Sequence, residues 1–243
     1  KRSLPRGFIE SAKGLTVDQV GPEDVTEYVT HSWYDDKDNG LNPSKGKTDP
    51  KFEQYSVDGK YSWGKAARLK DMPAEVGPLA RMLVAYLQPN PDPTVKKYID
   101  TALAALSKAA GTELPPTVLV SLLGRVAARN LECAVVAEWM VGWVNELIAA
   151  IAGGDSSYFV TERGTDGDGA GLWEAPRGSV GHWMSVKGGK IANYQVVAPT
   201  TWDISPRDDK GVLGPMEQAL VGTPIIDAEK PLEILQVAHS FDP

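Results

Sequence analysis

The sequence predicts an α+β protein that is mainly helical, with long buried bundle helices and small antiparallel β elements. Between residues 73 and 152, apolar side chains recur at helical spacing. After residue 158, two short apolar runs flank Gly188-Gly189, which is the pattern of a β-hairpin. The chain has 243 residues, of which 42% are hydrophobic and 23% charged, so it can bury a sizeable core.

Residues 1–70 are predicted to be a loop-rich region that wraps a partner or a neighbouring segment. Four prolines and a polar cluster at residues 35–46 interrupt any long regular element. Short alternating runs at 27–33 and 55–63 predict strands. His31, set among aromatic residues, is more typical of a packed structural histidine than of a ligand.

Residues 73–152 are predicted to form a helical bundle. Apolar positions recur every three or four residues from 75 to 87, and the helix should stop before Pro89. A second, alanine-rich helix is expected over 94–110, ended by Gly111. The third starts at Pro115-Pro116 and runs to about residue 152, a length of roughly 55 Å.

The third helix is expected to lie buried at the centre of the bundle, because apolar residues occupy more than one of its faces. Trp139 and Trp143 are then core residues, and Cys133 a small buried hydrophobe. Arg129 and Glu132 are spaced to pair on one face of this helix.

Residues 158–243 contain the candidate site. A glycine-rich loop is predicted over 158–171, followed by two hairpin strands at 179–186 and 191–197. Arg177, between Pro176 and Gly178, lies on a stiff turn before the first strand, and Thr200 follows Pro199 just after the second. Antiparallel pairing places both side chains at one end of the hairpin. Short helices are expected at 215–220 and 231–239.

Charge and cysteine content exclude several classes of function. The formal charge of −7 and the absence of a basic run argue against a nucleic-acid partner. The single cysteine, Cys133, excludes an internal disulfide and any multi-cysteine metal site within these residues. No uncharged apolar run approaches the ~18 residues of a membrane span, so no transmembrane segment is predicted.

Several short strings, in register along the whole chain, resemble the large subunit of nickel-iron hydrogenases. They are VGPEDVTEYVTHSWY at 20–34, EVGPLARMLVAY at 75–86, EAPRG at 174–178, GHW at 181–183, APTTW at 198–202, SPRD at 205–208, the GP-E-AL-GTP pattern at 214–224 and SFDP at 240–243. The strings match the C-terminal half of that subunit, so the resemblance implies part of the large-subunit fold. The chain stops where the family's second CxxC begins, so it is expected to be a fragment.

The resemblance implies a nickel-iron centre with cyanide and carbon monoxide on the iron, held by cysteines that this chain lacks. Arg177 matches the arginine over the open metal position, and Asp242 matches the carboxylate that orients it. Pro176, Pro199 and Thr200 match residues around the cyanide and carbon monoxide ligands. The backbone carbonyl of Val196 matches a contributor to a nearby magnesium site.

The implied reaction is reversible heterolytic cleavage of H2, with electrons passed to an iron-sulfur small subunit. The other implied partner is the missing N-terminal half of the large subunit. Localisation is expected to be periplasmic and membrane-associated through the small subunit, or alternatively cytoplasmic. Where the family commonly has asparagine after PTTW, this chain has Asp203, which adds a negative charge near the site.

Two other readings stay open from the sequence. The quinone-site subunit of respiratory complex I shares the fold and an EAPRG-like turn but is a metal-free scaffold. APTTW and SFDP argue against it, because they belong to the metal pocket. A purely structural helical piece that docks against the missing half is the third reading.

Overall fold

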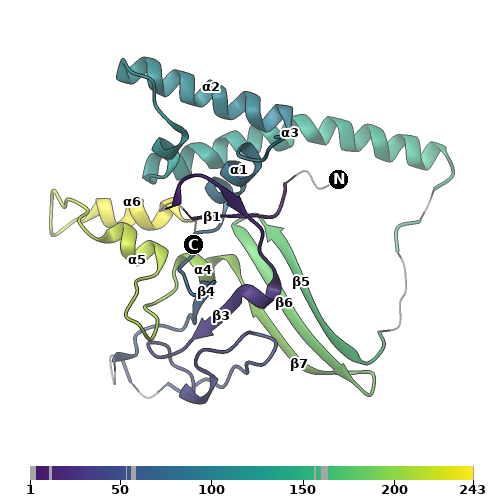
Figure 1. Cartoon of the computed structure of the whole chain (residues 1–243), viewed down its shortest axis with the longest axis vertical. Coiled ribbons are helices and arrows are strands. Elements are labelled where there is room, and N and C mark those ends of the chain that lie inside the picture. The colour runs from purple at the N-terminus through teal and green to yellow at the C-terminus, as the bar shows by residue number, and fades with distance from the viewer. Residues whose placement is uncertain are drawn as a thin grey trace.

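The computed structural model describes residues 4–10, 13–52, 54–55, 59–155, 157–159 and 164–242. A helical layer formed by α1, α2 and α3 lies at one end, and three long strands, β5 to β7, run away from it (Figure 1). The C-terminal end returns to the region between the helices and the strands (Figure 1). The α+β, mainly helical fold class is therefore confirmed.

Among the described residues of the first 70, the regular elements are all short. These are β1 (Phe8–Ile9), β2 (Val17–Asp18), the 3-10 helix η2 (Pro22–Asp24), β3 (Val25–Tyr28), the 3-10 helix η3 (Asp36–Asp38) and β4 (Ala66–Leu69). β1 pairs with β2 and β3 with β4, both antiparallel. The prediction of a strand at 55–63 was wrong, because residues 55 and 59–63 form none. Residues 56–58 lie outside the described part of the chain. His31 hydrogen-bonds the Gly59 carbonyl, which supports its structural role.

Three helices build the first core, with ends set by local capping. They are α1 (Pro78–Tyr86), α2 (Pro93–Ala110) and α3 (Leu122–Ala152), the last preceded by the 3-10 helix η5 (Pro116–Leu119). Asp92 caps α2 by accepting from the Thr94 amide, and Gly111 ends it in the left-handed conformation. Ser121 caps α3 at the Gly124 amide. Met82, Ile99 and Val135, one from each helix, are almost fully buried.

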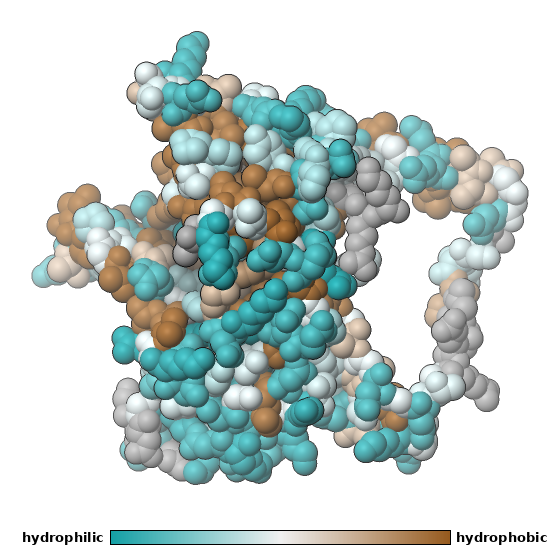
Figure 2. All heavy atoms as spheres, viewed as in Figure 1, coloured by the Kyte–Doolittle hydropathy of each residue, from teal (hydrophilic) through white to brown (hydrophobic). Residues whose placement is uncertain are grey.

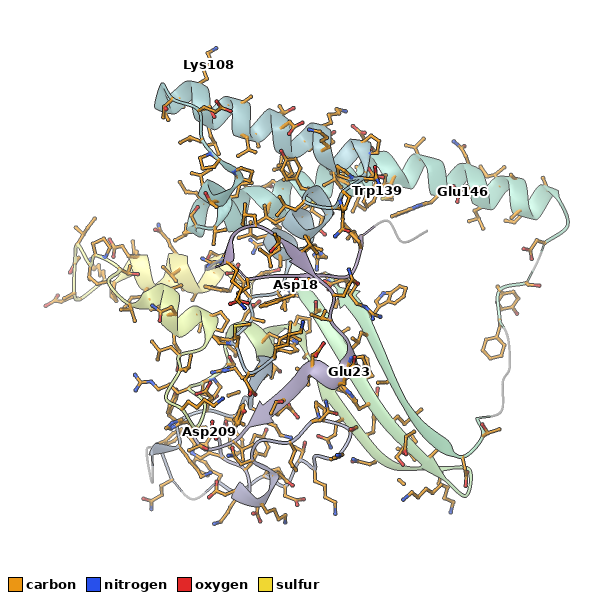
Figure 3. The ribbon with its side chains drawn as sticks, viewed as in Figure 1. Asp18, Glu23, Lys108, Trp139, Glu146 and Asp209 are labelled. Carbon is orange, nitrogen blue, oxygen red and sulfur yellow. The ribbon has the colours of Figure 1, made fainter. Side chains whose placement is uncertain are left out.

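The second half of α3 departs from the predicted burial. The buried residues of α3, Gly124, Ala128 and Val135, all lie in its first half, while most large apolar residues from 140 to 151 are exposed. In Figure 3, Trp139 lies where α3 leaves α2, and Glu146 lies on the projecting part. Figure 2 shows apolar surface on that part.

Periodicity identified an apolar helix correctly, but it could not show which segment covers each face. Trp139 packs against the core as predicted, whereas Trp143 and Cys133 are exposed. By length and composition, α3 is also long and apolar enough to cross a membrane, although no transmembrane segment was predicted from the charge pattern. A helix that is covered in a larger protein meets the same criteria.

The C-terminal region is organised around a three-stranded antiparallel sheet. Its strands are β5 (Gly167–Ala175), β6 (Gly178–Lys187) and β7 (Lys190–Val197), in the order β5-β6-β7. The predicted hairpin at Gly188-Gly189 is confirmed as β6 and β7. Residues 167–171, the first part of β5, were predicted as loop because of their glycines, but β5 pairs along its whole length with β6. The Asp166 carboxylate accepts from both turn amides, Gly188 and Gly189.

Three short helices complete the chain: α4 (Pro199–Asp203), α5 (Pro215–Leu220) and α6 (Leu232–Ser240). Pro199 and Pro215 each occupy the start of a helix, where the missing N–H costs nothing. Trp183 of β6 and Trp202 of α4 pack with Val25 and Ala67 in a second core. This core joins the sheet to the N-terminal strands.

Arg68 of β4 is fully buried and ties the N-terminal region to the segment after α4. Its Nε donates to the Asp208 carboxylate at 2.8 Å, and its other N–H groups bond Ser205 Oγ and three backbone carbonyls. The Asp208 pKa is lowered because the Arg68 guanidinium and nearby amides outweigh the effect of burial. Each charge is therefore compensated within the core.

Replacing Arg68 with methionine leaves Asp208 buried without its cation. We expect the free energy of unfolding to fall by about 3 to 5 kcal/mol, measured by urea denaturation. Lys96→Met is the control, because it breaks only an exposed ion pair with Asp100 and should lower the free energy of unfolding far less. Equal losses in the two variants would contradict this account.

Candidate functional site

Arg177 occupies the tight turn between β5 and β6, so it lies inside a hairpin and does not simply precede one. Ala175 pairs with Gly178, and Pro176 and Arg177 form the turn between them. Gly178 has φ of 140°, and a Cβ there would lie 2.5 Å from the Val76 side chain. Only glycine fits this position, because both the backbone conformation and the space exclude a side chain.

The turn packs directly against the start of α1. A Cβ on Gly77 would come within 3.1 Å of the Arg177 carbonyl oxygen, and Gly77 itself has φ of 113°. The two glycines allow the two backbones to approach each other closely. The Arg177 turn is thus held by backbone contact as well as by its own proline.

Arg81 of α1 binds the same turn from the interior. Its guanidinium donates to both oxygens of Glu132 at 2.6 and 2.7 Å, to Glu174 at 2.9 Å, and to the carbonyls of Ala175 and Pro176 at 2.9 and 2.8 Å. Burial favours the neutral form of Arg81, but its two carboxylate partners outweigh burial and keep its pKa raised. All five N–H groups of the guanidinium are used.

The structure brings Arg177 and Asp242 close together. Arg177 Nε lies 3.8 Å from Asp242 Oδ2, and the Arg177 side chain is half-exposed. Asp242 follows α6 with φ of 56°, a left-handed conformation that turns the chain sharply. Two residues 65 positions apart in sequence therefore meet at one end of the sheet.

A second guanidinium at this site, that of Arg129, was not anticipated. Its Nε lies 3.9 Å from the same Asp242 oxygen, and its Nη2 donates to the Ser240 carbonyl at 2.9 Å. Arg129 Nε is buried and has no hydrogen-bond partner among the described residues. The predicted pairing of Arg129 with Glu132 was wrong, because Arg81 takes both Glu132 oxygens.

Arg125, one turn before Arg129, fixes two further segments. It forms a bidentate pair with Glu75, at 2.7 and 2.8 Å, and its guanidinium lies 3.9 Å from the centre of the Phe241 ring. The sequence carries a signal for this arrangement. Arg125, Arg129 and Glu132 are three charges within eight residues of an otherwise apolar helix.

Val196 and Thr200 lie at and just beyond the C-terminal end of β7, which is the end away from the Gly188-Gly189 turn. The register pairs Gly181 with Val197, so the start of α4 follows β7 at the same end of the sheet as the Arg177 turn. Thr200 is the second residue of α4 and is partly buried, after a buried Pro199. Val196 pairs with His182, whose ring hydrogen-bonds Tyr194 as a structural histidine would.

The prediction that Asp203 adds a negative charge near the site is not supported by the environment of its carboxyl group. Its carboxylate accepts from the Val76 amide at 2.9 Å, and its side chain is buried. Burial raises the pKa of Asp203 to about 8, so the carboxyl is largely neutral at pH 7. Its role in the structure is to hold the backbone before Gly77, against which the Arg177 turn packs.

The side chains at this site fit the surroundings of a metal centre but not its ligand set. Two arginines and a partly buried hydroxyl suit small anionic or polar metal ligands. The one cysteine of the sequence is exposed on α3. Among the described residues, no group of three or more His, Cys, Asp or Glu side chains is arranged to hold a metal ion.

The fold and this site define a mixed α and β chain in which two guanidinium groups, those of Arg129 and Arg177, face the Asp242 carboxylate. A family model described as nickel-dependent hydrogenase matches residues 1–243. The chain belongs to the nickel-dependent hydrogenase family.

Relatives and solved structures agree with this assignment. The chain is 41% identical to the uptake hydrogenase large subunit of Bradyrhizobium diazoefficiens, covering 99% of this chain and 43% of that protein. It is 39% identical to the hydrogenase-2 large chain of Escherichia coli, covering 99% and 44%. The Ni-Fe-Se hydrogenase from D. vulgaris Hildenborough superposes with a TM-score of 0.81 and 32% identity, covering 100% of this chain and 48% of that one. The chain thus spans less than half the length of these relatives.

The raised pKa of Asp203 makes stability depend on pH. An unperturbed aspartate titrates near pH 3.8, so between about pH 4 and 8 the unfolded chain releases a proton that the folded chain keeps. Stability from this group is therefore lost as the pH rises through that window. Asp203→Asn keeps an acceptor for the Val76 amide and should be more stable than the parent by about 1 to 3 kcal/mol at pH 8.

Thermal unfolding at pH 5, 7 and 9 measures this effect. The advantage of Asp203→Asn should grow from pH 5 to pH 9, whereas Asp209→Asn, at an exposed position, should show no such trend. An advantage that is constant with pH would show that Asp203 does not titrate in this range.

Proposed function

We propose that this chain is part of the catalytic large subunit of a nickel-iron hydrogenase, which cleaves H2 reversibly into protons and electrons. The observation that carries the proposal is the Arg177–Asp242 pair in a chain of this family. Arg177 lies on a rigid turn, and Asp242 follows α6. The electrons would pass to an iron-sulfur small subunit. The named large subunits among the relatives support such a partner.

The cofactor we propose is a nickel-iron centre carrying cyanide and carbon monoxide. When bound, it supplies the redox chemistry of H2 cleavage. Arg177 provides a fixed positive charge beside it, since a guanidinium stays protonated and does not serve as a resting base. Asp242 would orient Arg177, the Thr200 hydroxyl would donate a hydrogen bond to a cyanide, and Pro176 and Pro199 would form apolar walls. The Val196 carbonyl would contribute to a magnesium site.

The thiolates would come from parts of the large subunit outside this chain, including its N-terminal half. The exposed apolar surface of α3 from residue 140 to 151 supports a docking contact with that half, since Glu146 is its one charged residue. Residues 1–70 would wrap the same partner. The whole assembly would be periplasmic and bound to the membrane through the small subunit; a cytoplasmic location is the alternative.

The complex I scaffold, the alternative function considered from the sequence, is not favoured. It would share the EAPRG-like turn but hold no metal. The hydrogenase reading is supported by the match over the whole chain and by relatives named as hydrogenase subunits. Metal content separates the two proposals.

The complete large subunit, purified with its small subunit, should contain nickel in an amount close to one atom per large subunit. Elemental analysis together with the intact mass of every polypeptide measures this ratio. The polypeptide that carries the nickel should include cysteines beyond Cys133, because one thiolate is too few for a four-cysteine centre. A folded complex without nickel would favour the scaffold.

Arg177→Lys should leave the fold and the nickel content near those of the parent but lower H2 turnover about 100-fold. An ammonium group keeps the charge but cannot reproduce the planar fork of the guanidinium. Arg207→Lys, at an exposed position, is the matched control and should keep parental turnover. Unchanged turnover in Arg177→Lys would remove this residue from the mechanism.

A further inference from the structure

We infer that Arg81 is a positioning residue for the reaction, acting through the backbone of the Arg177 turn. The inference rests on the proposed function and goes beyond it, because Arg81 touches neither the Arg177 side chain nor Asp242. Its guanidinium binds the carbonyls of Ala175 and Pro176, the two residues immediately before Arg177. Arg81 therefore determines where the turn begins and so where the Arg177 side chain can reach.

The composition of the turn gives such support a role. Pro176 has no N–H to donate. Gly178, which has a positive φ, loses much conformational freedom when the turn is ordered. Glu174, just before the turn, is bonded by both Arg81 and Ser179. The guanidinium thus binds a side-chain carboxylate and two backbone carbonyls within three consecutive residues.

Glu132 anchors Arg81 to α3. The bidentate contact uses both carboxylate oxygens and keeps the guanidinium plane fixed. One turn earlier on the same helix, Arg129 binds the Ser240 carbonyl and faces Asp242. One segment of α3 therefore positions both members of the Arg177–Asp242 pair, Arg177 through Arg81 and Asp242 through Arg129.

Lysine cannot replace Arg81 in this arrangement. An ammonium has three donors, whereas Arg81 uses five N–H groups on five acceptors. Arg81→Lys keeps the charge that compensates Glu132 and Glu174, so the interior should remain electrostatically balanced. The carbonyls of the turn would lose donors, and the position of Arg177 would be less fixed.

Arg68 provides a matched control. It is also a buried arginine with five hydrogen bonds, one to a carboxylate and three to backbone carbonyls, but none of these partners belongs to the Arg177 turn. Arg68→Lys should therefore cost stability without changing the chemistry. The comparison separates loss of a buried guanidinium in general from loss of this one.

The experiment compares the parent enzyme, Arg81→Lys and Arg68→Lys, each as the complete large subunit with its small subunit. Turnover is expressed per nickel atom, so misfolded or unloaded protein does not count. Arg81→Lys should lower kcat for H2 about tenfold with KM changed less than about twofold, and Arg68→Lys should change neither by more than about twofold. Equal kcat per nickel in Arg81→Lys and the parent would overturn the inference.

Hydrogen exchange gives a readout that does not depend on the metal. Amides of residues 172–182 should exchange faster in Arg81→Lys than in the parent, and at the parental rate in Arg68→Lys. Parental exchange in Arg81→Lys would show that the turn does not depend on Arg81. If Arg81→Lys does not accumulate, Glu132→Gln provides the same test, because it weakens the anchor and leaves Arg81 in place.

A double-variant cycle tests whether Arg81 acts through Arg177. In the Arg177→Lys background, adding Arg81→Lys should lower kcat by less than about twofold, because the group being positioned is already gone. Independent, multiplicative losses would assign Arg81 a general structural role and overturn the inference. A parent complex that lacks nickel or H2 turnover would contradict the proposed function itself, and a nickel-loaded, active parent is the condition for interpreting the Arg81 results.

Discussion

Buried ion pairs between α1, α3 and the Arg177 turn hold the candidate site in place. The Arg81–Glu132 pair is the central one, because it joins two helices and supplies the donors for the turn carbonyls. A buried pair of this kind contributes little net stability, since desolvating both charges offsets most of their attraction. Its effect is on geometry: an arginine with all five donors used has one orientation. The site therefore depends on a contact that stability arguments alone would overlook.

The same segment of α3 organises three distant parts of the chain. Arg125 holds Glu75 and lies over Phe241, Arg129 holds the end of α6, and Glu132 holds α1 through Arg81. These charges lie on the half of α3 that packs against the other helices. Beyond Trp139 the helix continues with apolar residues and Glu146 as its one charge. The first half of α3 thus organises the site, and the second half presents a surface suited to contact with more protein.

Asp203 shows how one residue can be read differently from sequence and from structure. As an aspartate near a candidate metal pocket, it suggests extra negative charge. In the structure it is buried beneath the backbone at residue 76, and its raised pKa keeps it largely neutral at pH 7. It supports Gly77, and Gly77 in turn contacts the Arg177 carbonyl. Two contacts therefore determine how the turn packs: Asp203 acts through the backbone at residues 76 and 77, and Arg81 acts through the turn carbonyls.

The sequence alone determined the helices of residues 75–152, the hairpin at Gly188-Gly189 and the stiffness of the Pro176-Arg177-Gly178 turn. These features follow from local causes, namely apolar periodicity, capping residues and the φ preferences of proline and glycine. The meeting of Arg177 with Asp242 was expected only through family resemblance. Tertiary structure decided the partners of Arg81, Arg129 and Glu132, the strand pairing of β5 and the exposure of the second half of α3. Each of these depends on which distant segment lies opposite, and neither propensity nor spacing along the chain encodes that.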